Sequence, residues 1–293
     1  MKSLLFIFLF FTANNLIAQT TIVRDPEIAQ MVSEVSADSL QSYINTLVAF
    51  GTRNTLSTQT DLKTGIGAAR NWVLKKFNQF AQNSNGRLSA TIDTTTIPAN
   101  GKRVNKPVHL GNVMATLKGT DPNDNRIFII SGHLDTRRSD VMDRTGDAPG
   151  ADDDGSGTSA VIECARVMSK HSFPATIIFV VVSGEEQGLL GSTFMANKAK
   201  KENWNIEAVF NNDIIGSNNS NETHIINNTK VRVFSEGIPM YETEKNIKRI
   251  MALGLENDSK SRELARYVKE TGERYVDNLE VQLVYRTDRF LRG

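Results

Sequence analysis

The side chains in this 293-residue chain that are best suited to chemistry are an imidazole and several carboxylates that follow apolar segments. They occur as His133 and Asp135 in SGHLDT, the acidic triplet 152–154 in GADDDGSG, the pair Glu185 and Glu186 in SGEEQGLLGS, and Asp213 in FNNDIIG. Imidazole and carboxylate groups together are the ligands of divalent cations that activate water in hydrolytic enzymes. The chain therefore predicts a metal-centred hydrolytic site.

The neighbouring residues in each cluster can divide the work of such a site. One imidazole with several carboxylates suits zinc, with cobalt or manganese as substitutes, and a carboxylate such as Asp152 can bridge two ions about 3.5–4 Å apart. His133 and Asp135 stand two apart in an extended chain and share a side, so Asp135 can orient the imidazole. Adjacent Glu185 and Glu186 point opposite ways, which permits one to bind metal while the other acts as a general base.

Strands must bring these clusters together. RIFII, ATIIFVVV and AVF leading to DIIG are continuous apolar runs, typical of strands covered on both faces. TSAVIECARVMSK between the first two predicts a helix, and helical crossovers between buried strands imply parallel neighbours. Because ligands bind beyond the carboxyl ends of parallel strands, we expect all the clusters at one edge of an α/β sheet.

The remaining elements follow from hydrophobic periodicity and from turn residues. Before the clusters, the pattern predicts helices within 36–50 and 65–82 and strands within 89–99 and 108–119. After them it predicts a strand within 223–235, a helical region from 241 to about 275, and a strand over 280–286. Gly254 is expected to end the first helix of that region, and Asn257, Asp258 and Ser259 to start the next.

The first 18 residues resemble a secretory signal peptide. Lys2 precedes the apolar run LLFIFLFF, and Ala18 offers a small residue for cleavage. We therefore expect a secreted or periplasmic protein whose residues 19–293 form a single domain, incomplete at its C-terminal end. No later segment is apolar enough to predict a membrane span.

Net charge and cysteine content give no indication of nucleic-acid binding or of a cysteine nucleophile. The formal net charge is +1, and loss of Lys2 leaves 33 basic and 33 acidic residues, so the composition gives no argument for nucleic acid. Cys164 is the only cysteine and lies in a helical pattern, where a buried residue is expected rather than a nucleophile. The oligomeric state cannot be read from the sequence.

Each cluster also has a purely structural interpretation. A histidine at a strand end, an Asp run before Gly and Ser, and paired Glu are common as packing, helix-capping and solvated groups. Their occurrence as an ordered set at successive strand ends favours the metal site. The other three histidines, His109, His171 and His224, lie in expected strands or at a helix end and carry no such pattern.

The ordered motifs SGHLDT, GADDDGSGTSAVIECARVM, SGEEQGLLGS and FNNDIIG resemble the zinc aminopeptidase and glutamate carboxypeptidase exopeptidases with paired metals. The resemblance is strong over 112–216, weak in the N-terminal helices and partial at the end of the chain. It implies a three-layer α/β/α sandwich around a mostly parallel mixed sheet, two Zn²⁺ ions, and peptide substrates.

The resemblance also implies a role for each residue. His133 and Asp213 would bind one zinc, Asp152 would bridge, and Glu186 would bind the other zinc. Glu185 would take a proton from the attacking water and pass it to the leaving amine, and Asp135 would support His133. A cis peptide bond is expected after the bridging aspartate, at Asp152–Asp153.

The chain departs from the family pattern near its end. The family's second metal takes a histidine from a loop after a segment much like YRTDRFLRG, and this chain has no histidine after His224. We interpret this as a sequence that stops before the last ligand, the alternative being a natural variant that lacks it. One metal firmly held at most, and weak or no activity, are expected of the 293 residues alone.

Three functions compete at this stage. An aminopeptidase acting on peptides is the leading interpretation. A glutaminyl cyclase shares the fold but carries an insertion after the paired acids, whereas GEEQGLLGS is compact. A non-catalytic binding protein on the same fold is the third, and its relatives usually lose ligands or the base, which remain in this chain.

Overall fold

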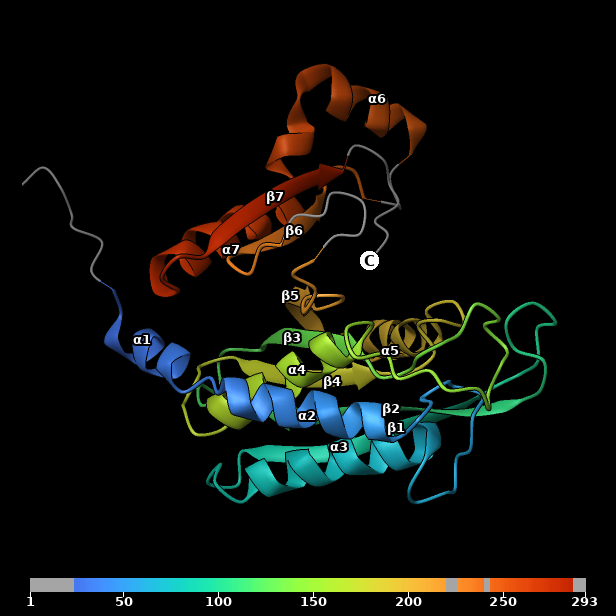
Figure 1. Ribbon diagram of the computed structural model, residues 1–293. Helices are drawn as coiled ribbons and strands as arrows, with labels where there is room; N and C mark the ends of the chain where they lie inside the picture. Colours follow the sequence, from blue (N-terminus) through green and yellow to red (C-terminus); the bar gives the residue numbers. More distant parts are fainter. Residues whose placement is uncertain (1–23, 220–225, 240–242, 287–293) are drawn as a thin grey trace, which may run out of the picture.

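A computed structural model of the protein describes residues 24–219, 226–239 and 243–286. The predicted signal peptide and His224 lie outside the described residues. The described chain is an α/β fold built on a mixed sheet (Figure 1), which confirms the predicted class.

The central sheet has five strands in the order β1-β2-β4-β3-β5. β2 is antiparallel to β1 and β4, whereas β3 is parallel to both β4 and β5. The strands are β1 (Leu88–Ile97), β2 (Val108–Leu117), β3 (Arg126–His133), β4 (Thr176–Val182) and β5 (Asn205–Asn211). The three parallel strands are the apolar runs that the sequence marked as buried, and β3 lies in the middle of them.

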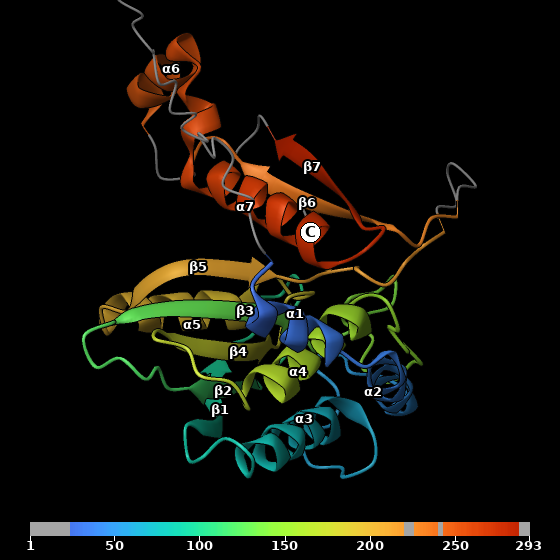
Figure 2. The same cartoon turned by 90° about the vertical axis from the view of Figure 1, so that its left-hand side faces the viewer.

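Helices cover both faces of this sheet. α2 (Ala37–Ala49), α3 (Gly65–Ala81) and α4 (Gly155–Met168) pack on one face, and α5 (Leu190–Lys201) lies on the other (Figures 1 and 2). This arrangement is the expected three-layer sandwich. Of the helices in the described ranges, none is both long and apolar enough to cross a membrane.

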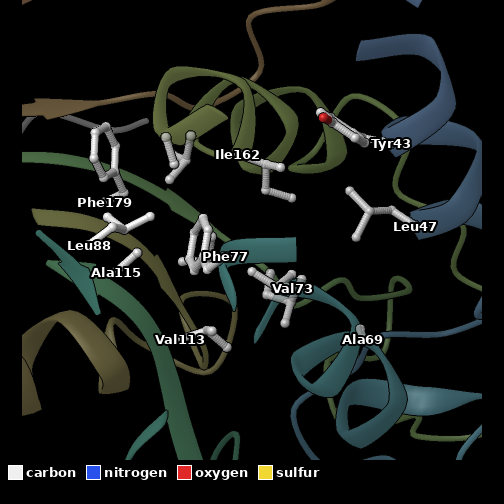
Figure 3. Packing of buried hydrophobic residues seen from close by; sticks show 14 of the residues in the cluster. Tyr43, Leu47, Ala69, Val73, Phe77, Leu88, Val113, Ala115, Ile162 and Phe179 are labelled. Carbon is white, nitrogen blue, oxygen red and sulfur yellow. The ribbon is translucent and has the colours of Figure 1, made fainter. Parts of the chain in front are cut away.

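The alternation of side chains along each strand separates the two cores. On β4, Ile177, Phe179 and Val181 contribute to the core under α2, α3 and α4 (Figure 3), while Ile178 and Val180 contribute to the core on the α5 side. Neighbouring residues of a strand point to opposite faces, so both sets become buried only when helices lie on both sides. β4 is therefore held in a fixed register at the centre of the molecule.

The helix boundaries follow the local sequence signals. The Ser36 hydroxyl accepts a hydrogen bond from Ser39 N and caps α2, and Gly254 ends α6 (Glu244–Leu253) with φ of 67°. The Ser259 hydroxyl accepts from Arg262 N and starts α7 (Lys260–Tyr275). Such caps satisfy backbone groups that a helix end leaves without partners, which is why helix ends carry a local sequence signal.

The C-terminal elements form a second layer beside β5 rather than extending the central sheet. β6 (Lys230–Glu236) and β7 (Glu280–Arg286) pair in parallel as a separate two-stranded sheet, next to α7 (Lys260–Tyr275) (Figure 2). α6 (Glu244–Leu253) and a 3₁₀ turn, Leu255–Asp258, lie between β6 and α7 in the chain. At the other end of the chain, α1 (Pro26–Ser33) meets α7 through Asp25 N, which donates to the Tyr275 hydroxyl at 2.8 Å.

Cys164 lies in α4 with a partly buried side chain. Burial, followed by the charge of Glu163, raises the pKa of its thiol to about 11. A thiol with this pKa is almost wholly protonated at neutral pH, and the thiolate is the reactive form. The structural role predicted for this cysteine fits its surroundings.

Candidate metal centre

The carboxyl ends of β3, β4 and β5 meet at one edge of the sheet, as expected for parallel neighbours. His133 is the last residue of β3, Glu185 and Glu186 follow the end of β4, and Asp213 follows the end of β5. The loop 134–154 starts at the same edge and returns to it at the start of α4. The topology thus gathers residues that are up to 80 positions apart in the chain.

Three side chains form a compact group that can hold a metal ion. One ligand atom from each of His133, Asp153 and Asp213 lies within 4.8 Å of the other two. His133 Nε2 is 3.1 Å from Asp153 Oδ1 and 3.8 Å from Asp213 Oδ1. His133 is buried, while the Asp153 side chain is 49 % exposed, so the group opens to solvent on the Asp153 side.

The structure places Asp153, not Asp152, at this group, and this corrects the sequence-based choice of Asp152. Asp152 Oδ1 instead accepts a hydrogen bond from Gly216 N at 2.9 Å. The non-proline cis peptide bond is also one position later than expected, at Asp153–Asp154. The turn into α4 points successive side chains in different directions, and three identical side chains gave no means of telling which one faces His133.

Asp154, to which the sequence assigned no separate role, ties the start of α4 to the end of β3. Its carboxylate accepts from Gly157 N as the N-cap of α4 and from His133 N, both at 2.8 Å. Burial raises the pKa of Asp154 to about 8, with His133 opposing the shift. Because both hydrogen bonds go to backbone groups, Asp154 positions the metal group rather than joining it.

Asp135 orients His133 through its backbone. His133 Nδ1 lies 3.0 Å from the Asp135 carbonyl oxygen, whereas the Asp135 carboxylate is farther away, with Oδ1 at 3.7 Å. A carbonyl can only accept, so this contact places the ring proton on Nδ1 and leaves the Nε2 lone pair for a metal. Asp135 therefore contacts the imidazole with its carbonyl oxygen and, at the longer distance, with its carboxylate.

The Asp135 carboxylate holds the turn that carries the paired glutamates. It is fully buried and accepts from Gly184 N at 2.8 Å and from the N–H groups of Glu185 and Glu186, each at 3.1 Å. Burial alone would raise its pKa, but His133 and these backbone N–H groups outweigh that effect and lower it. One ionised side chain therefore links the β3 end to the β4 end.

Negative charge accumulates around His133 without enough positive charge to balance it. Burial, and then the neighbouring carboxylates, raise the pKa values of Glu185 and Asp213 and raise that of Glu186 to about 7. Asp213 Oδ1 is buried and has no hydrogen-bond partner among the described residues. A divalent cation would supply both the missing charge and the missing partner, so the donor set fits a metal ion.

The chain is similar to known proteins in sequence and in fold. The model of peptidase family M28 matches residues 112–279, which contain every side chain of the metal group. The chain belongs to peptidase family M28. It is 42 % identical over 269 residues to a probable zinc metalloprotease of Leptosphaeria maculans, and 42 % identical over 270 residues to one of Pyricularia oryzae.

The M28 chain covers only part of these longer proteins. The alignments include 92 % of this chain but 62 % and 53 % of the two fungal proteins. Among solved structures, the LapA aminopeptidase of Legionella pneumophila shares the fold with a TM-score of 0.62 and 22 % identity, over 89 % of this chain and 58 % of that one. A glutaminyl cyclase of Bacteroides thetaiotaomicron gives 0.57 and 16 %, over 86 % and 77 %.

Arg53 is a buried residue behind the metal group, and sequence analysis missed its role. Its side chain is 1 % exposed, and its guanidinium donates hydrogen bonds at 2.7–2.9 Å to the carbonyls of Leu47, Leu134, Pro149 and Gly150. It thereby joins the end of α2, the residue after His133, and the loop just before the acidic triplet. An isolated arginine in GTRNT has no periodic or motif signal, so only the tertiary structure reveals this role.

Replacement of Arg53 by leucine is expected to destabilise the metal-free protein by about 3 kcal/mol, because buried carbonyls would lose their donors. Arg53→Lys keeps the positive charge but has fewer hydrogen-bond donors, so this variant should lose less stability than Arg53→Leu. Urea unfolding in excess chelator measures the free energy of unfolding without the contribution of bound metal. Arg126→Gln, at the exposed start of β3, is the matched control, and an Arg53→Leu protein as stable as this control would contradict the role.

Proposed function

We propose that this protein is a zinc-dependent exopeptidase of the aminopeptidase type. The observation that carries the proposal is the compact group of His133, Asp153 and Asp213, in which the buried Asp213 Oδ1 has no hydrogen-bond partner among the described residues. This group lies beside the turn that carries Glu185 and Glu186. The names of the two fungal relatives and of LapA support zinc, peptidase and aminopeptidase chemistry in related proteins.

The donor set supports an assignment of the zinc ligands. His133 and Asp213 would hold one ion, Glu186 would hold another, and Asp153 would be shared between them. Asp153 suits the shared position because it contacts His133 Nε2, and its charge contributes to the raised pKa of Glu186. Bound zinc supplies Lewis-acid polarisation of the peptide carbonyl and lowers the pKa of water.

Glu185 is assigned as the general base and acid. Its backbone N–H is held by Asp135, and its side chain is close enough to His133 and Asp213 for their charges to shift its pKa. Its carboxylate would take a proton from the attacking water and give it to the leaving amine. A raised pKa makes the carboxylate a better proton acceptor in the first step. The leaving amine is a stronger base than any carboxylate, so the proton can still be passed on in the second step.

Metal removal tests the proposal. The full-length protein should hydrolyse leucine p-nitroanilide and lose at least about 100-fold of its kcat/KM after dialysis against a zinc chelator, because the metal stabilises charge in the transition state. Added Zn²⁺ should restore activity. N-acetyl-leucine p-nitroanilide is the matched control substrate, since an aminopeptidase requires a free amine.

Two outcomes would replace the proposal with its alternatives. Release of ammonia from peptides with N-terminal glutamine, without hydrolysis of leucine p-nitroanilide, would indicate a glutaminyl cyclase. Inactivity on all these substrates with zinc present would indicate a binding protein on the peptidase fold.

A further inference from the structure

A hollow of about 480 Å³ adjoins the metal centre, and arginines line it. Its walls combine two metal-centre carboxylates with cationic and small residues of the loop after β3: Arg137, Arg138, Ser139, Gly150, Asp153 and Glu186. A substrate whose scissile bond lies at Asp153 and Glu186 would extend into this hollow. The charges in the hollow therefore bear on which substrates the site accepts.

Arg137 is held at the hollow by Glu186. Arg137 Nε lies 3.1 Å from Glu186 Oε2, and the arginine side chain is 43 % exposed while that of Glu186 is 11 % exposed. If Glu186 binds zinc, the metal takes over the neutralisation of this carboxylate. The guanidinium, which has five N–H donors in a planar fork, then has donors available for another anion.

Arg138 and Arg103 add positive charge around the same position. Arg138 Nη1 pairs with Asp143 Oδ2 at 3.1 Å, but this pair is exposed, and the other Asp143 oxygen is already held by the backbone N–H groups of Thr145 and Gly146. Exposed ion pairs contribute little to stability, so Arg138 can leave Asp143 and turn toward a ligand with a small loss of free energy. Arg103 Nη1 donates to the Glu186 carbonyl oxygen at 2.7 Å and borders the turn.

We propose that this hollow is a carboxylate-binding subsite, in which Arg137, assisted by Arg138, binds a carboxylate of the peptide on the leaving-group side of the scissile bond. The proposal rests on the proposed peptidase function and narrows its substrate class to peptides with a carboxylate close to that bond. The carboxylate has two chemical sources: the C-terminus of a very short peptide, or an acidic side chain. A paired arginine and carboxylate form short, charge-assisted hydrogen bonds that fix orientation as well as affinity.

Binding to an inactive enzyme tests the subsite separately from catalysis. Zinc-loaded full-length protein carrying Glu185→Gln is titrated calorimetrically with Leu-Ala against Leu-Ala-amide, and with Leu-Glu-amide against Leu-Gln-amide. The first pair tests a main-chain carboxylate and the second an acidic side chain. In at least one pair, we expect the peptide that carries the carboxylate to bind about 10-fold more tightly than its uncharged partner. The pair that shows this difference identifies whether the carboxylate comes from the main chain or from a side chain.

Arginine variants then test whether Arg137 and Arg138 are the source of the preference for a carboxylate. Arg137→Gln, alone and with Arg138→Gln, should reduce the preference to less than about threefold, because the charged donors are lost. Arg126→Gln, a surface arginine at the opposite end of β3, should leave the preference unchanged. All three positions are exposed or partly exposed, so the variants keep the buried core intact.

Two results would overturn the subsite. Equal affinity within both peptide pairs would exclude carboxylate recognition. A preference that survives Arg137→Gln with Arg138→Gln would assign the carboxylate to the metal ions. Absence of turnover by the unmutated enzyme would refute the peptidase function instead, and an arginine-dependent acid preference would still support the subsite.

Discussion

Asp153→Asn in the full-length protein is expected to lower kcat/KM for leucine p-nitroanilide by about 10³-fold or more and to reduce tightly bound zinc. The reason is the position of Asp153 Oδ1, 3.1 Å from His133 Nε2, where one carboxylate faces the atom that would hold a metal. An amide has no negative charge to offer two cations, and loss of metal-based stabilisation is worth several kcal/mol, or at least about 10³ in rate. Turnover and zinc content per protein measure the two effects.

Asp152→Asn is the matched control for this prediction. The two residues are adjacent and identical, but Asp152 Oδ1 accepts from Gly216 N, and an asparagine oxygen can accept the same hydrogen bond. Its kcat/KM should therefore stay within about threefold of the unmutated value. A larger loss in Asp152→Asn than in Asp153→Asn would reverse the assignment and restore the choice made from the sequence.

Glu185→Gln is expected to lower kcat by about 10²–10⁴-fold while zinc content stays unchanged. Glutamine preserves the shape of the side chain, and the backbone N–H of residue 185 can still donate to Asp135. What is lost is the ability to accept and return a proton. Stopped assays at high enzyme concentration, with zinc analysis of the same sample, separate loss of the base from loss of metal.

Glu186→Gln provides the contrast, because the neighbouring residue is assigned to the metal. Its main effect should be a lower zinc content, with activity reduced as a consequence. The two variants differ by one position on the same turn, whose N–H groups both donate to Asp135. If Glu185→Gln lost zinc and Glu186→Gln retained it, the roles of base and ligand would have to be exchanged.

The sequence by itself determined from which strand ends most of the candidate site residues come. His133, Glu185, Glu186 and Asp213 could be placed because apolar runs of strand length precede them, and parallel strands with helical crossovers end at the same edge. The helix end at Gly254 could be predicted because glycine adopts the left-handed conformation that often ends a helix. In each case the signal is local and lies within a few residues of the position in question.

The tertiary structure decided the features that depend on the direction of a side chain or on contacts between distant segments. It selected Asp153 from three identical aspartates, because the conformation of the turn into α4 determines which one faces His133. It showed that the Asp135 carbonyl orients the imidazole while its carboxylate holds the next turn. It also revealed Arg53, whose four carbonyl partners come from three separate segments that only the folded chain brings together.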